Sequence, residues 1–136
     1  MKVKAIFRLV VFSLALNLSL GLFAQQNEPI ESSVDTYALA PMEKQAVSDF
    51  IFANINYPKE EIGSGISGMV IVKFVVEKDG TISNLTIDKS LSTLLDQEAQ
   101  RVISLIPGKW IPATVNGQNV RSYVKLPVMF SDPNKK

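Results

Sequence analysis

A strand, a tight turn and a second strand between residues 68 and 88 constrain the fold of this chain most. Residues 68 to 77 are rich in valine, isoleucine and phenylalanine, and both faces of this run are largely apolar. Lys78-Asp79-Gly80 supplies the residues of a tight turn, because glycine adopts positive φ without steric penalty. Residues 81 to 88 return as the second strand, so the sequence predicts an antiparallel hairpin.

The returning strand contains one break in its alternation. Ile82 does not share parity with Leu85 and Ile87, which should lie on the same face if the strand were regular. We therefore expect a β-bulge near Ser83 or Asn84.

Apolar residues at helical spacing predict one helix on each side of this hairpin. The first begins near Pro41 and ends before Tyr57-Pro58, since the residue before a proline disfavours the helical region. The second begins near Thr93, which with Asp96 resembles a capping pair, and ends at Pro107-Gly108. The apolar positions are Val47, Phe50, Ile51 and Ile55 in the first helix and Leu95, Ala99, Val102, Ile103 and Ile106 in the second.

A third strand is predicted near the C-terminus. Asn116-Gly117 is a strong turn signal, and residues 120 to 130 then alternate. Trp110, in the apolar connection before this turn, is expected to plug the core. The order helix, strand, strand, helix, strand predicts an α+β fold, a three-stranded antiparallel sheet with two helices packed on one face.

The N-terminal residues are typical of an export signal. Three basic residues precede an apolar run that ends at Ala24, and the sequence then turns polar. We expect residues 1–24 to be a signal peptide. The alternative is an uncleaved anchor, because residues 6 to 24 approach the minimum length for crossing a bilayer.

The remaining chain divides into three parts. Residues 25–40 are polar and aperiodic, which indicates a flexible lead-in. Residues 41–131 form the predicted domain, and residues 132–136 a polar tail. At 136 residues, one hydrophobic core is expected.

Composition excludes several classes of function. The chain has no histidine and no cysteine, which removes the commonest nucleophile–base pairs and zinc ligands. Its net charge is +1, without a long run of like charges, so we expect no nucleic-acid partner. Asp96, Glu98 and Arg101 more plausibly supply a helix N-terminal charge and a local ion pair than a catalytic site. We therefore expect no enzyme, no cofactor and no metal.

Several short motifs together resemble the C-terminal domain of TonB-family proteins, over roughly residues 47 to 130. They are Gly68 to Gly80, Asp96-Gln-Glu-Ala99, Arg101-Val-Ile103, Pro107-x2-Trp110-x-Pro-Ala113, Asn116-Gly117 and Leu126-Pro-Val-Met-Phe130. Two further motifs, Phe50-Ile-x2-Asn54-x2-Tyr-Pro58 and Gly65-Ile-x-Gly68, resemble the form found in Bacteroidetes-type TonB-like proteins.

The resemblance implies a periplasmic domain that docks on TonB-dependent outer-membrane receptors. It would capture their TonB box as an added strand, and so take part in energy-coupled nutrient transport. In the family the final strand is the receiving edge, which corresponds here to residues 121 to 130. The expected partner-binding residues are Arg121, Tyr123, Lys125, Pro127 and Met129.

Pro127 sets the orientation of this edge. Because proline has no N–H, it is tolerated within a strand where that position faces away from the ladder, so Pro127 should point outward. Alternation then turns the backbone groups of Tyr123, Lys125 and Met129 outward as well. An equally simple interpretation is that Pro127 only prevents unwanted edge pairing.

Two features of full energy transducers in this family, a Ser-x3-His motif in the anchor and a long proline-rich spacer, are missing. The lead-in of sixteen residues reaches at most about 55 Å. Three hypotheses therefore remain: a soluble periplasmic binding module, an inner-membrane-anchored chain that works with proteins of the TonB complex, and a self-associating structural or cell-wall-binding domain that forms a homodimer without a role in transport.

Overall fold

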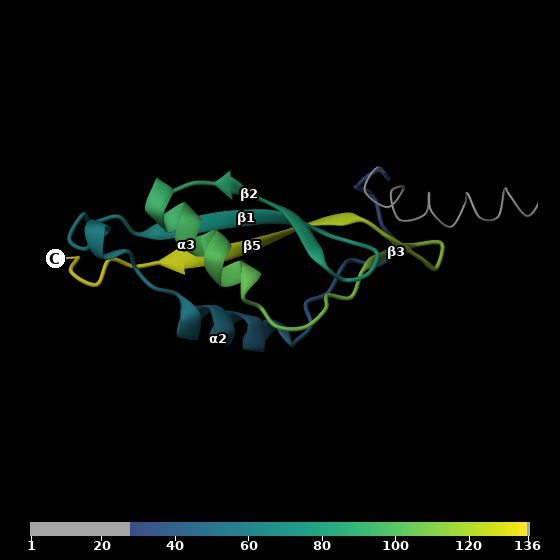
Figure 1. The fold of residues 1–136 in the computed structure, drawn as a ribbon, viewed down its shortest axis with the longest axis horizontal. Helices are drawn as coiled ribbons and strands as arrows, with labels where there is room; N and C mark the ends of the chain where they lie inside the picture. Colours follow the sequence, from purple (N-terminus) through teal and green to yellow (C-terminus); the bar gives the residue numbers. More distant parts are fainter. Residues whose placement is uncertain (1–27, 136) are drawn as a thin grey trace, which may run out of the picture.

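The computed structural model describes residues 28–135, which form an α+β fold as predicted (Figure 1). The elements are α2 (Lys44–Asn54), the short 3-10 helix η1 (Lys59–Glu61), β1 (Gly68–Val76), β2 (Ile82–Lys89), α3 (Thr93–Ser104), β3 (Ala113–Val115), β4 (Gln118–Val120) and β5 (Ser122–Phe130). The expected three-stranded antiparallel sheet is confirmed, in the order β2-β1-β5, and β3 and β4 form a separate two-stranded sheet. The signal peptide predicted for residues 1–24 lies outside the described residues. Neither helix of the described part has the length and apolarity needed to cross a bilayer.

The hydrophobic core lies between one face of the sheet and the two helices. Four alternate residues of β1 on this face are fully buried: Val70, Val72, Phe74 and Val76. Val47 and Ile51 of α2 and the apolar stripe of α3 pack on the same face, and Figure 1 shows α3 across the sheet and α2 along its β5 side. Trp110 plugs this core as expected, with its ring edge-on to Phe74 at 5.1 Å between centroids. Replacing Phe74 by alanine would therefore cost about 3–5 kcal/mol.

The β1–β2 hairpin has the predicted turn and the predicted bulge. Gly80 has φ of 83°, and a Cβ there would lie 2.3 Å from the carbonyl oxygen of Trp110, so only glycine fits. The pairing shifts register between Lys73, opposite Thr86, and Val75, opposite Ser83. Asn84, with φ of 51°, is the extra residue.

The start of α3 differs by one residue from the expected capping pair. The hydroxyl of Ser92, not of Thr93, accepts the Leu95 N–H at 3.2 Å. The Asp96 carboxylate accepts the Leu91 N–H at 3.1 Å, so it still supplies negative charge to the first turn.

The last strand is shorter than the alternation of residues 120 to 130 indicated. Asn116 and Gly117 have φ of 51° and 74° and form the predicted turn. This turn, however, joins β3 to β4, and the chain breaks its ladder at Arg121 before β5 begins. At this break the Arg121 side chain is buried against Glu77.

The C-terminal tail begins with a buried residue rather than a solvated one. The Asp132 carboxylate accepts the N–H groups of Asn134, Gly63 and Gly65, the last at 2.7 Å. These backbone hydrogen bonds lower the pKa of Asp132 below its usual value. Asp132 therefore fixes the glycine-rich loop after η1 to the end of β5.

A candidate partner-binding edge

The outer edge of the sheet at β5 is long and regular. β5 pairs with β1 over nine consecutive residues, from Ser122 opposite Val76 to Phe130 opposite Gly68, without a register shift. β5 is also the terminal strand of the sheet. Its second side is therefore a candidate site for an added strand.

Two independent observations show which backbone groups of β5 face outward. Pro127 lies opposite Ile71, and because proline has no N–H this pair cannot be hydrogen-bonded to β1. At the other end, the carbonyl of Arg121 accepts the Glu31 N–H of the lead-in at 2.9 Å, on the side away from β1. Positions 121 and 127 share parity, so the five residues expected at the edge all turn their backbone groups outward: Arg121, Tyr123, Lys125, Pro127 and Met129.

The side chains of four of these residues are exposed on the sheet face opposite the helices. Tyr123 stacks under Lys73, whose ammonium lies 4.0 Å from the ring centroid. Lys125 reaches across β1 to Asp88 of β2 at 2.9 Å. Met129 is 66% exposed, and Pro127 is also exposed. The edge therefore presents ordinary surface side chains beside its outward backbone groups.

Arg121 has a different environment, since its side chain is only 7% exposed. Its guanidinium donates to Glu77 at 2.8 Å and to the Glu28 carbonyl at 2.5 Å. Burial raises the pKa of Glu77, but the hydrogen bonds from Arg121 and Ser83 outweigh it, and the pKa lies below its ordinary value. Arg121 therefore attaches the lead-in to the β1–β2 hairpin.

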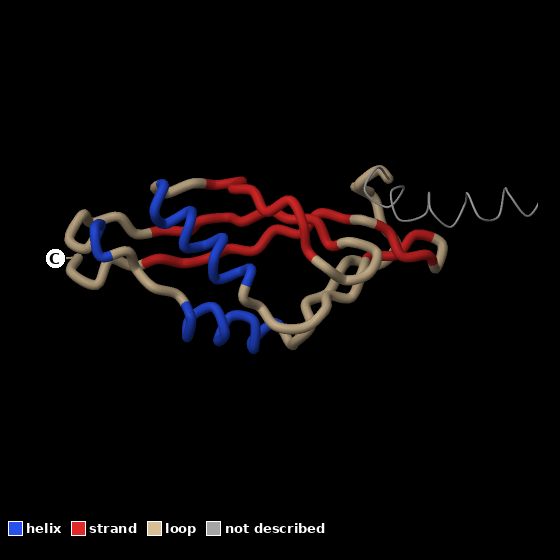
Figure 2. Tube along the Cα trace, in the orientation of Figure 1, coloured by secondary structure: helices blue, strands red, loops and turns tan. Residues whose placement is uncertain are grey.

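The lead-in covers only the beginning of the β5 edge. Glu31 forms a parallel bridge with Ser122, and the chain then leaves β5 to bridge Thr114 through Thr36 and Ile111 through Leu39. Figure 2 shows this segment as loop beside the β3–β4 hairpin. The described part of the lead-in is thus held by backbone hydrogen bonds, and is more closely attached than its aperiodic sequence indicated. Past Tyr123, no other segment within residues 28–135 pairs with this edge.

Apolar hollows flank the edge at two places, on the side of α2. The first, which we call the Trp110 hollow, is lined by residues of the lead-in, α2 and β5: Ala38, Leu39, Ala40, Pro41, Met42, Glu43, Lys44, Val47, Trp110, Ile111, Val124 and Leu126. The second, which we call the Phe52 hollow, is lined by Phe52, Ile55, Tyr57, Met129, Phe130 and Ser131. Sequence reasoning did not find these hollows. One signal was available, because Phe52 is a large apolar residue outside the helical stripe and proves to be 85% exposed.

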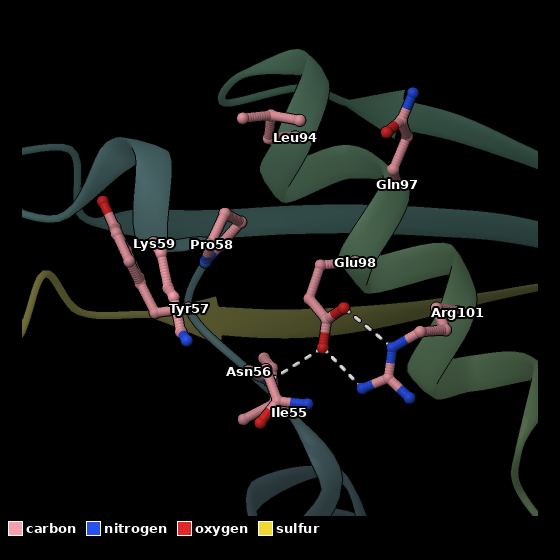
Figure 3. A pocket seen from close by; sticks show the side chains of 9 residues that line it. All are labelled: Ile55, Asn56, Tyr57, Pro58, Lys59, Leu94, Gln97, Glu98 and Arg101. Atoms are coloured by element: carbon pink, nitrogen blue, oxygen red, sulfur yellow. Dashed lines mark hydrogen bonds and ion pairs between the residues drawn. The ribbon is translucent and has the colours of Figure 1, made fainter.

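A third cavity lies between α3 and the turn that follows α2 (Figure 3). Its centre is the ion pair of Glu98 and Arg101 at 2.6 Å, which confirms the expected local pair. Glu98 also accepts the Asn56 N–H at 2.7 Å, and Arg101 donates to the Asn54 carbonyl at 2.7 Å. Burial raises the pKa of Glu98, but the hydrogen bonds from Arg101 and Asn56 outweigh this effect. The pKa of Glu98 therefore lies below its ordinary value. Glu98 and Arg101 therefore bond to each other and to the backbone at the end of α2, and in this way they attach α3 to the turn after α2.

A family model described as Gram-negative bacterial TonB protein C-terminal matches residues 53–131, more than half of the chain. The chain belongs to this family. TonB C-terminal domains are associated with TonB-dependent transport and are not known as a catalytic family, and their proteins lie in the periplasm or face it from the membrane. Within residues 28–135 no three histidine, cysteine, aspartate or glutamate side chains are grouped to hold a metal ion.

Two solved structures of TonB C-terminal domains from Helicobacter pylori are similar to this TonB C-terminal domain. The solution structure of residues 179-285 has 23% sequence identity and a TM-score of 0.47, and covers 64% of this chain and 78% of that one. The solution structure of residues 194-285 has 22% identity and a TM-score of 0.47, and covers 66% and 94%. No curated protein compared with the chain matches it.

Proposed function

We propose that this TonB C-terminal domain docks on TonB-dependent outer-membrane receptors by adding an extended receptor segment to the outer edge of β5. The observation that carries the proposal is the outward parity of positions 121 to 129 on a strand with an uninterrupted register. The domain acts in the periplasm, to which the leader at residues 1–24 directs it. Inner-membrane proteins of the TonB complex are its further partners.

The backbone of β5 offers an incoming strand a defined set of hydrogen bonds. Lys125 and Met129 each present an N–H and a carbonyl, whereas Pro127 presents a carbonyl alone. Each bond contributes about 0.5–1.5 kcal/mol, so a few of them give weak, reversible docking unless side chains add to it. The parallel bridge of Glu31 at Ser122 is an intramolecular example of a strand on this edge.

The proposal is tested with isotope-labelled protein and synthetic peptides of receptor TonB boxes. Strand addition should shift the amide resonances of Lys125 and Met129 and protect them from exchange with solvent. Val124 and Val128, which have the opposite parity, should keep their protection, because their N–H groups already bond to β1. If peptides bind while the Lys125 and Met129 amides are unaffected, the edge is not the docking site. If the native protein is found in the membrane fraction with residues 1–24 still attached, these residues are an anchor and not a cleaved leader.

A further inference from the structure

The Trp110 hollow and the Phe52 hollow both lie beside the open edge of β5. Both combine residues of α2 with residues of β5: Val47 and Leu126 in the first, and Phe52 and Phe130 in the second. α2 lies on the β5 side of the sheet (Figure 1). A strand added to β5 would therefore lie next to both hollows.

The alternation of a strand fixes which added side chains enter the hollows. Leu126 and Phe130 point to the helix side of the sheet, where both pack with the core. Residues directly opposite each other on neighbouring strands share a face, so the added residues opposite these two positions also point toward α2. These two added residues are four apart, about 13 Å along a strand, for either strand direction.

The chemistry of the hollows indicates what these side chains are. The Phe52 hollow has no charged residue in its lining. In the Trp110 hollow the two charged residues, Glu43 and Lys44, have opposite sign. Large apolar side chains stand open to solvent at the rims: Leu39 is 58% exposed, Ile111 56% and Phe52 85%. Such surfaces favour apolar occupants, because burying them removes apolar area from water.

We propose that the two hollows together select extended segments with two large apolar side chains four residues apart, one for each hollow. This inference rests on the proposed function and specifies its partner. The open backbone edge requires an occupant in the extended conformation, and the two hollows set the spacing of its two apolar side chains. Residues three or five apart would put one side chain on the far face, where Lys73 and Lys125 lie.

The spacing is tested with nine-residue peptides of a serine- and threonine-rich background, whose affinity for the domain is measured by calorimetry. One peptide carries leucines four apart, a second carries them three apart, and a third carries a single leucine. The first should bind about tenfold more tightly than either of the others, the effect of partly burying one more leucine. Equal affinity for all three, with the Lys125 and Met129 amides still shifted, would overturn the spacing and leave edge docking intact. Peptides that bind nowhere on β5 would overturn both.

Variants of the hollows assign each leucine to its site. Phe52→Ser should weaken the binding of the peptide with leucines four apart by about tenfold. It should leave unchanged the affinity for a peptide that lacks the leucine opposite Phe130. Leu39→Ser should do the same for the leucine opposite Leu126. Leu105→Ser is the control, because Leu105 is also an exposed apolar residue, at 47%, and lies outside both hollows. If Leu105→Ser weakens binding as much as Phe52→Ser, the loss is nonspecific and the assignment fails. Sedimentation across concentration checks whether a second copy of the chain occupies the hollows, which would contradict the proposal.

Discussion

The two edges of the sheet differ in how readily a further strand can add to them. β2 pairs with β1 through two register shifts, and its outer end carries exposed Asp88 and Lys89. β5 pairs with the same central strand over nine residues without a shift. Bulges and charged side chains are the usual means by which an edge avoids pairing. Within residues 28–135 the domain thus protects one edge along its length, whereas the other is covered by the lead-in only at its beginning and interrupted further on by Pro127.

The helices increase this difference. On the β2 side, the Gln100 side chain of α3 donates to the Leu85 carbonyl at 3.3 Å, which occupies one backbone acceptor. On the β5 side, α2 leaves the Trp110 and Phe52 hollows beside the edge. An exposed strand edge beside apolar surface is a hazard for aggregation, and an added partner strand would cover both the edge and the hollows.

The largest effect should come from a second proline on β5, introduced at either of two adjacent positions. Leu126→Pro removes an N–H that bonds to β1 and should lower the free energy of unfolding by about 3 kcal/mol or more. Lys125→Pro removes an outward N–H, so it should cost much less stability and weaken peptide binding roughly fivefold, the effect of one lost hydrogen bond. Urea unfolding and calorimetry measure the two properties.

Lys125→Ala is the control for this pair, because it removes the exposed ion pair with Asp88, worth at most about 0.5–1 kcal/mol, and keeps the N–H. If Leu126→Pro and Lys125→Pro lower the free energy of unfolding equally, the assignment of outward and inward backbone groups on β5 is wrong.

The bulge that protects the β2 edge depends on Asn84. Its φ of 51° is accessible to asparagine but strained for a branched side chain. Asn84→Val should lower the free energy of unfolding by about 1–2 kcal/mol, whereas Asn84→Gly should be nearly neutral. Thermal unfolding of the two variants makes the comparison, and a valine as well tolerated as glycine would mean that the bulge lies elsewhere.

Local patterns predicted most of this fold. The hairpin, the bulge near Asn84, the Asn116-Gly117 turn and the two helices follow from residues within a few positions of each other. The outward parity of β5 was likewise readable from Pro127 alone. Each of these features depends on backbone conformation or alternation, which a short stretch of sequence determines.

Features that depend on distant polar partners could not be predicted. Arg121 and Glu77 are 44 residues apart, and Asp132 is 67 residues from Gly65. A polar residue has the same appearance in the sequence whether it is solvated or buried in a hydrogen-bond network. The attachment of the lead-in, the early break before β5 and the fixed tail were missed for this reason. The hollows were missed because they form between α2 and β5, which lie at opposite ends of the domain sequence.

Pro127→Ala tests whether the proline restrains the open edge. Alanine restores an outward N–H, and one more hydrogen bond of about 1 kcal/mol should tighten peptide binding roughly fivefold. Stability should fall by about 0.4–1 kcal/mol, since the unfolded chain gains conformational freedom. Sedimentation should also show more self-association, because the edge loses its one interruption. Unchanged affinity and unchanged association would show that strands do not pair at position 127.

The smallest effect concerns the lead-in at the beginning of the same edge. The lowered pKa of Glu77 means that the folded state favours its charged form, so its contribution to stability is fully present above the ordinary glutamate pKa of 4.5. As the pH falls from 4.5 through the lower folded pKa, this contribution is lost and the hold of Arg121 on the lead-in weakens. The chemical shift of the Glu31 amide, which bonds to the Arg121 carbonyl, reports this change. In Glu77→Gln the amide should lose this titration, whereas Glu28→Gln, which removes only the ion pair of Glu28 with Lys78, should retain it. A Glu31 amide that titrates identically in all three proteins would show that Glu77 does not control the covered part of the edge.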